Sequence, residues 1–179
     1  MENIIKNIKE HFDVSDIVQK RDNLTFLTVK KENAISLVTH LRDTAGFKHL
    51  VLLTAVDWIE DGLFQLTYML NNHEAKCDIG VRTMIPRDNP VMESAHHLWV
   101  QVKTYQRELK EMFGIDFPGS PGVNDSFILE GWDDIPPYRR DFQTREYADE
   151  TYFPRGGRST KDPKTHMLEK LDPNQPLKG

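Results

Sequence analysis

Cysteine is almost absent from this sequence, because only Cys77 occurs among its 179 residues. A single thiol cannot form a disulfide within the chain, and it cannot by itself hold an iron–sulfur cluster or a structural zinc ion, which need several ligands. Cys77 lies inside a β-rich stretch with no nearby base in the sequence, so we expect a buried and unreactive thiol. The sequence therefore predicts no redox cofactor and no metal on this chain.

Long apolar runs are lacking as well, and none approaches the about 20 residues that a membrane-spanning helix requires. The start of the chain, MENIIKNIKEHF, is charged throughout and does not match a signal peptide. The formal net charge of −5 disfavours a general binder of nucleic acid or of anionic membranes. We therefore expect an intracellular, soluble or peripheral protein whose length allows one hydrophobic core.

Basic residues are enriched at the C-terminal end of the chain, although 17 of the 23 lie before residue 154. Residues 154–179 carry six basic and three acidic side chains, a net charge of +3, which leaves −8 for residues 1–153. A basic, proline-bearing segment on an acidic body suits docking on another protein. A solvated tail is the alternative interpretation, and the composition alone does not separate the two.

The apolar periodicity predicts an α+β fold, with one mainly antiparallel sheet and helices on one face. Periodicity is lost after Pro118, and eight of the ten prolines lie from there onward. We therefore divide the chain into an α+β domain at 1–117 and an extended C-terminal arm at 118–179. We expect a central strand, buried on both faces, at 49–59. The other expected strands are 24–29, 63–70 and 75–84. The expected helices are 3–12, 31–44 and one that begins near Glu93 or Ser94, can break or bend before Trp99, and ends at Gly114.

The helix at the end of that domain carries a family signature. The stretch from Tyr105 to Pro121, YQRELKEMFGIDFPGSP, resembles the signature of the C subunit of respiratory complex I. The same family includes the matching subunit of membrane-bound, energy-converting [NiFe] hydrogenases and of their sulfur-reducing relatives. Three further stretches resemble the family: Ala55–Trp58, Val91–Ser94, and Trp132 with Pro137–Phe142. All four stand in the family's order, and the resemblance as a whole covers about 20–145.

Two departures from the family pattern indicate a branch. Ser120 stands where the family usually has histidine, and residues 122–126 lack the paired arginines that usually precede Ile128 and Leu129. These departures favour the hydrogenase or sulfur-reductase branch. NADH:quinone oxidoreductase proper is the alternative within the family.

The resemblance implies a non-catalytic structural subunit in the peripheral arm of a membrane-bound respiratory complex, at the cytoplasmic face of the cell membrane. Its implied partners are a large subunit with a [NiFe] or quinone-type site and a small subunit with an iron–sulfur cluster, and antiporter-like membrane subunits belong to the same complex. The C-terminal arm is expected to pack on these partners. This role agrees with the absence of a ligand set for a redox centre in the sequence.

Charged and aromatic side chains around the signature are the candidates for locking the arm in place. Arginine forks that hold carboxylates with two hydrogen bonds would fix how the arm leaves the domain. Aromatic side chains interleaved with arginine are common anchors of interfaces. A surface ion pair of little energetic value is the alternative. The candidates are Arg107, Glu108, Trp132, Tyr138, Arg139, Arg140, Asp141 and Phe142.

Two hypotheses of other classes remain open from the sequence. A stand-alone hydrolase would use Asp57 with Glu60, or the pair at 133–134, as general acid and base or as Mg²⁺ ligands. A free-standing binding module would use the arm to hold a partner only transiently. His96 and His97 are adjacent, so on a helix they point about 100° apart and cannot chelate one metal as an i, i+4 pair does.

Overall fold

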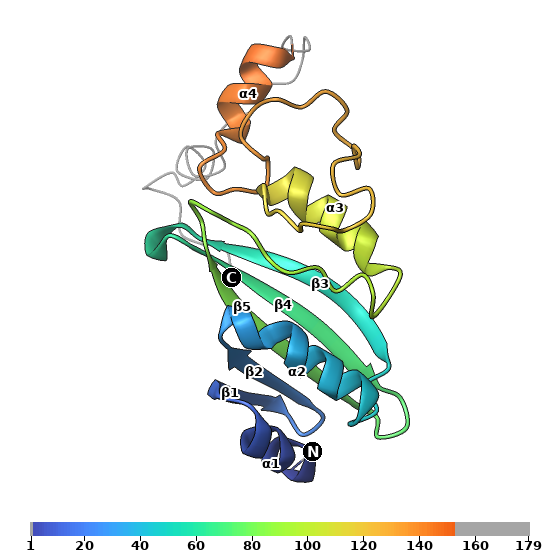
Figure 1. Cartoon of the computed structure of the whole chain (residues 1–179). Coiled ribbons are helices and arrows are strands. Elements are labelled where there is room, and N and C mark those ends of the chain that lie inside the picture. The colour runs from blue at the N-terminus through green and yellow to red at the C-terminus, as the bar shows by residue number, and fades with distance from the viewer. Residues whose placement is uncertain (1, 153–179) are drawn as a thin grey trace, which may run out of the picture. The chain divides into compact units, whose positions relative to one another are not determined.

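The structure, a computed structural model, describes residues 2–152 and divides into two compact units, Met1–Phe142 and Gln143–Gly179 (Figure 1). Helix α4 (Thr144–Thr151) belongs to the second unit. The first unit holds the remaining elements, in the order α1 (Glu2–His11), β1 (Val14–Arg21), β2 (Leu24–Val29), α2 (Lys31–Asp43), β3 (His49–Trp58), η1 (Ile59–Asp61), β4 (Leu63–Asn72), β5 (Cys77–Pro86) and α3 (Val102–Phe113).

The five strands form one sheet in the order β1-β2-β5-β4-β3. Strands β2 and β5 pair in parallel, and the other three pairs in the sheet are antiparallel. On β4 the fully buried Phe64, Leu66, Tyr68 and Leu70 alternate with less buried neighbours, so one face of the strand holds the core. Buried residues of α1, α2 and α3 join the same apolar cluster. The predicted α+β fold with helices on one face is confirmed.

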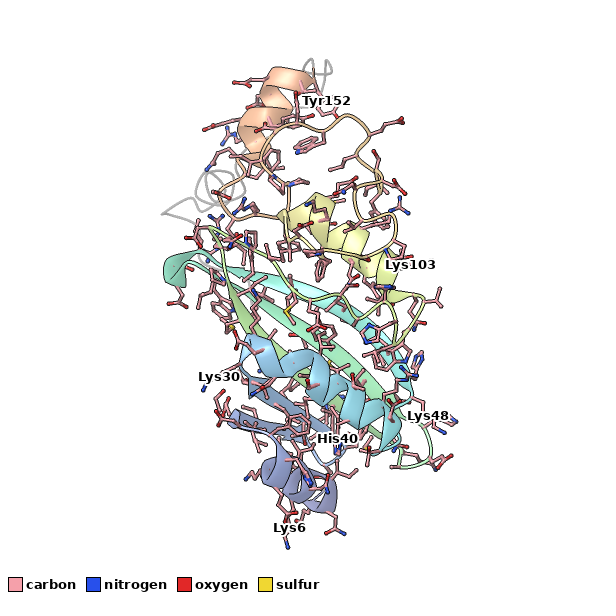
Figure 2. The ribbon with its side chains drawn as sticks, in the orientation of Figure 1. Lys6, Lys30, His40, Lys48, Lys103 and Tyr152 are labelled. Carbon is pink, nitrogen blue, oxygen red and sulfur yellow. The ribbon has the colours of Figure 1, made fainter. Side chains whose placement is uncertain are left out.

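The N-terminal helix α1 is attached to α2 through His40. The His40 Nε2 atom lies 3.0 Å from Asn7 Oδ1, and its ring stacks on the ring of His11 with 5.9 Å between centroids. Figure 2 shows His40 between the two helices, and it places Lys30 and Lys48 at the two ends of α2. Ile8 on the inner side of α1 is fully buried.

Strand β3 is an edge strand, so the predicted central strand with two buried faces is wrong. Its residues alternate between buried and exposed, and Trp58 is 42% exposed. Its free edge is covered in part by α3 and the turn before it, which explains why so apolar a strand can lie there. Tyr105 Oη donates to the carbonyl of Val51 at 3.0 Å, and Gln101 Nε2 donates to the carbonyl of Leu50 at 3.0 Å.

Strand β1 was not predicted from the sequence, because its apolar residues do not alternate regularly. It pairs with β2 with register shifts near both ends, and most of its residues are exposed. The expected helix start at Glu93 or Ser94 is also wrong, since α3 begins at Val102. Ser94 instead donates to Gln106 Oε1 at 2.8 Å and accepts from the backbone N–H of His96 at 3.3 Å. These bonds stabilise a turn where the helix was expected.

The end of α3 at Gly114 is confirmed. Gly114 adopts a left-handed conformation (φ 77°), and its N–H donates to the carbonyl of Lys110 at 2.9 Å. A Cβ atom at this position would also lie 3.3 Å from the Pro136 ring. Glycine therefore serves two purposes here, because it ends the helix and lets the later chain approach closely.

Candidate functional site

The carboxylate of Asp57 is the centre of a charged cluster at one end of the sheet. Asp57 lies near the end of β3, and its side chain is 2% exposed. Strand pairing places it opposite Phe64 on β4, which in turn pairs with Ile85 on β5. Arg87, which directly follows β5, donates from Nε to Asp57 Oδ1 at 2.9 Å and from Nη2 to Oδ2 at 3.2 Å. This is the two-bond geometry that a guanidinium favours with a carboxylate.

The segment 136–142 joins the same cluster from a distant part of the sequence. Arg87 Nη2 also donates to Asp141 Oδ1 at 2.6 Å, and the backbone N–H of Arg140 donates to Asp57 Oδ2 at 2.9 Å. Arg139 Nη2 donates to the carbonyl of Arg87 at 3.2 Å. We call Asp57, Arg87, Arg139, Arg140 and Asp141 the Asp57 clasp. It attaches the segment to the ends of β3 and β5.

The charges of the clasp stabilise one another. The hydrogen bond with Asp57 raises the pKa of Arg87, although burial opposes this. Burial pushes the pKa of Asp141 upward, but the hydrogen bond from Arg87 and the other favourable contacts outweigh it, so the pKa is lower than usual. Arg140 also reaches beyond the clasp, because its Nη1 donates to Glu60 at 2.5 Å and lowers the pKa of that exposed carboxyl. Arg87, Asp141 and Glu60 are therefore charged at neutral pH.

An aromatic column beside the clasp connects the sheet, α3 and the segment 136–142. Phe113 on α3 makes edge-to-face contacts with Phe64 on β4 at 5.9 Å and with Tyr138 at 5.7 Å between centroids. The guanidinium groups of Arg87 and Arg139 lie 5.7 and 5.4 Å from the centroid of Phe64. Salt bridges and aromatic packing thus hold the same stretch of chain.

Two charged residues of α3 hold the loop that follows the helix. The carboxylate of Glu111 accepts three backbone N–H bonds, from Phe127 at 2.6 Å, Ile128 at 2.8 Å and Leu129 at 2.9 Å. Burial alone would raise the pKa of Glu111. The three hydrogen bonds favour the charged carboxylate and together outweigh burial, so the net pKa is lower than usual. Arg107 donates to the main-chain carbonyls of Asp125 and Ser126. Its partners are main-chain oxygens instead of the carboxylate that the sequence led us to expect.

The predicted locking residues are distributed over several separate contacts in the structure. Arg139, Arg140 and Asp141 come together in the clasp, and Tyr138 joins the aromatic column. Trp132 packs edge-to-face on Phe142 at 5.5 Å between centroids. Arg107 belongs to the anchor of the loop. Glu108, on the same helix, lies outside the clasp, the aromatic column and the loop anchor.

Sequence reasoning missed three members of these networks, namely Asp57, Arg87 and Glu111. Asp57 was considered as half of an acidic pair with Glu60 and as part of the family-like stretch Ala55–Trp58, but not as the partner of an arginine. A usable signal was present, because a lone carboxylate in the apolar run LVLLTAVDW needs a buried partner. The identity of that partner, 30 positions further on, was not available from the spacing.

The carboxylate of Asp57, which a hydrolase would use, is fully engaged in hydrogen bonds. Both oxygens of Asp57 accept hydrogen bonds from Arg87, and Oδ2 also accepts one from the Arg140 N–H. Between residues 2 and 152, no three side chains of His, Cys, Asp or Glu are grouped to hold a metal ion. His96 and His97 lie edge-to-face, with 6.0 Å between ring centroids. No helix in this range is long and apolar enough to cross a membrane.

Comparison with known proteins agrees with the signature around α3. Residues 27–148 match the family described as "Respiratory-chain NADH dehydrogenase, 30 Kd subunit". The C subunit of the NADH-quinone oxidoreductase of Moorella thermoacetica is 28% identical over 148 residues, which cover 80% of this chain and 95% of that protein. Its counterpart from Citrifermentans bemidjiense is 31% identical over 141 residues, with 77% and 86% covered.

Two solved structures share the fold. A chain of the membrane-bound sulfane sulfur reductase, an archaeal respiratory membrane complex, superimposes with a TM-score of 0.79 at 24% identity, covering 90% of this chain and 97% of that one. The trypsin-resistant fragment of Nqo5 gives a TM-score of 0.56 at 19% identity, covering 67% and 96%. With the family match over 27–148, the chain belongs to the family of the 30 kDa subunit of respiratory-chain NADH dehydrogenase.

Proposed function

We propose that this chain is a non-catalytic structural subunit in the peripheral arm of a complex I-related, membrane-bound oxidoreductase. It would stabilise the large and small cofactor-bearing subunits during electron transfer coupled to ion translocation. Membership of the 30 kDa subunit family supports the assignment to a complex I-related oxidoreductase. The observation that carries the structural role is the Asp57 clasp, in which the buried carboxylate and its cation bind another part of the same chain and leave no free catalytic carboxylate at Asp57.

The clasp suits such a role because it orders the segment 136–142 before a partner binds. The segment 136–142 is bound to β3 and β5 by charges and to α3 by the N–H of Tyr138, which donates to the carbonyl of Met112 at 2.9 Å. A segment that is already ordered loses less conformational entropy when a partner binds. The protein would therefore present a rigid surface, from which the C-terminal arm continues onto its neighbours.

Within the family, we propose the hydrogenase or sulfur-reductase branch. Ser120 and the arginine-free stretch 122–126 support this choice. The fold shared with the sulfane sulfur reductase chain extends over most of this chain. The second candidate is the C subunit of NADH:quinone oxidoreductase proper, which is favoured by the name of the relative that is 31% identical.

The proposal assigns the cofactors to the partners. The small subunit would carry an iron–sulfur cluster and the large subunit a [NiFe] or quinone-type site, while this chain would hold neither. The complex would lie at the cytoplasmic face of the cell membrane, with its antiporter-like subunits in the bilayer. The C-terminal arm after Tyr152, proposed to pack on partner subunits, lies outside the described residues.

The decisive experiment is purification of the native complex in mild detergent through a tag on this chain, followed by mass spectrometry and assays for Ni, Fe and flavin. We expect antiporter-like membrane subunits and Fe without flavin. Nickel would assign a hydrogenase, and its absence would assign a sulfur- or quinone-reducing relative. Flavin with a nicotinamide-oxidising module would favour the second candidate. Recovery of this chain alone, without metal, would overturn the proposal.

A further inference from the structure

Three large apolar side chains are exposed to solvent on the loop that follows α3. Ile128 is 67% exposed, Tyr138 57% and Ile135 41%. Figure 1 shows the loop, coloured orange, beside α3. Exposed apolar side chains that gather on one segment are typical of protein interaction sites. Their neighbours Phe127 and Leu129 instead pack against the core.

Hydrogen bonds of the loop hold these side chains in place while they face solvent. The N–H of Ile128 is bound to Glu111 at 2.8 Å, although its side chain is the most exposed of the three. The indole N–H of Trp132 donates to the carbonyl of Ile135 at 3.1 Å. The apolar groups are therefore preorganised, which reduces the entropy that a partner must overcome on binding.

The charge of the loop specifies the partner. Residues 118–138 contain four carboxylates and neither lysine nor arginine. None of the four forms a salt bridge with a cation of residues 2–152. The two nearest basic residues on α3 have other partners, since Arg107 binds main-chain carbonyls and Lys110 binds Asp116 at 2.6 Å. The four carboxylates are Asp125, Glu130, Asp133 and Asp134.

A hollow of about 280 Å³ lies between α3 and this loop. Val123, Leu129 and Pro136 supply apolar walls, and Asp125 and Asp134 also line it. The α3 residues Arg107, Lys110 and Glu111 line its other side, where each is already bonded to a partner within the chain. An arginine or lysine side chain fits this combination, because its aliphatic stem can contact the walls while its charged head meets the carboxylates. The apolar side chains on the same loop would pack against the rest of the partner segment.

We infer that the loop at 118–138 is the docking surface for a basic, apolar segment of a neighbouring subunit, with one arginine or lysine inserted beside Asp125 and Asp134. This inference rests on the proposed function, since it requires a permanent partner. It assigns the acidic loop to a particular contact, whereas the proposed function concerns the role of the whole chain.

The test uses the tagged full chain in its native complex. One variant neutralises the loop by Asp125→Asn, Glu130→Gln, Asp133→Asn and Asp134→Asn, and a control neutralises four distant carboxylates by Glu10→Gln, Asp16→Asn, Asp22→Asn and Glu74→Gln. Retention of partner subunits is measured at low and high salt. A photo-crosslinking amino acid at Ile128 in the otherwise unchanged chain reports the neighbour directly, and the same group at Lys20 is its control.

We expect the neutralised loop to retain partners about tenfold less at low salt, whereas the control variant behaves like the unchanged chain. High salt should reduce this difference. The adduct at Ile128 should map to a lysine- or arginine-bearing segment of another subunit. An intact complex with unchanged retention, or an adduct to an acidic segment, would overturn the inference and leave the proposed function standing. If the unchanged chain recovers no partner, both fail.

Discussion

Arg87 and Asp57 are 30 positions apart, yet two guanidinium nitrogens contact both carboxylate oxygens at 2.9 and 3.2 Å. Both side chains are largely removed from solvent, at 16% and 2% exposure. The same guanidinium continues to Asp141 at 2.6 Å, so one arginine links the end of the sheet to the segment beyond α3. We therefore expect the segment 136–142 to lose its place on the sheet when the Asp57–Arg87 pair is broken.

Removing the carboxylate of Asp57 should destabilise the fold strongly. Asp57→Ala leaves Arg87 partly buried without its main partner, and breaking a buried pair in this way costs about 3–5 kcal/mol. The free energy of unfolding from urea titration measures the loss. Glu60→Gln is the matched control, because its pair with Arg140 is exposed and should contribute little. Equal stabilities for the two variants would contradict the central position of Asp57.

Acid should weaken the clasp through Asp141. Its pKa is lower in the folded state than in the unfolded chain, so the stabilisation is complete above the unfolded value of about 3.9 and is lost as the pH falls through the folded value. The free energy of unfolding of the unchanged chain and of Asp141→Asn should therefore converge as the pH is lowered from 7 to 3. A constant difference between the two free energies of unfolding across this range would show that the charge of Asp141 does not contribute to stability.

The loop after α3 should depend on Glu111. Glu111→Ala removes the acceptor for three backbone N–H groups, and we expect a cost of about 1–3 kcal/mol in local stability. Amide hydrogen exchange at 127–129 should become faster, while exchange in the sheet stays unchanged. Glu108→Ala is the control, since it lies on the same helix outside this network. Similar exchange in both variants would contradict the anchoring role.

Gly114 should tolerate a side chain less well than Gly119. Both residues have positive φ, 77° and 79°, so alanine at either position has the same backbone strain, about 1–2 kcal/mol. Only at Gly114 would the new Cβ meet a neighbour, 3.3 Å from Pro136, whereas nothing lies within 4 Å at Gly119. We expect Gly114→Ala to have the lower urea midpoint. Equal midpoints would mean that Pro136 moves away without cost.

Local signals in the sequence predicted the parts of the fold that depend on local chemistry. The end of α3 follows from a glycine after an amphipathic stretch, and the structure confirms it. The position of β3 at the edge could not be read from its own residues, because it depends on Tyr105 and Gln101 reaching its carbonyls from about 50 positions away. The polar strand β1 is likewise specified by its pairing with β2 and not by its own pattern.

The candidate site shows the same division between local and distant information. Arg139, Arg140 and Asp141 were found because they form one motif in the sequence. Their partners Asp57 and Arg87 lie more than 50 positions earlier, and no periodicity connects them to the motif. The sequence predicted a locking role for this segment, and the structure was needed to identify the residues of the domain that contact it.

Charge reversal in the clasp should disrupt assembly of the complex. Arg140→Glu places a carboxylate beside Glu60 and near Asp57, and Arg139→Glu removes the bond to the Arg87 carbonyl and places a second carboxylate near Asp141, so like charges face one another where cations now hold the segment. We expect the tagged variant to recover less of the large and small subunits than the unchanged chain. Arg145→Glu on α4, where the existing pair with Asp149 is exposed, is the matched control. A double variant that assembles into a fully active complex would show that the clasp stabilises only this chain and does not lock the arm to its partners.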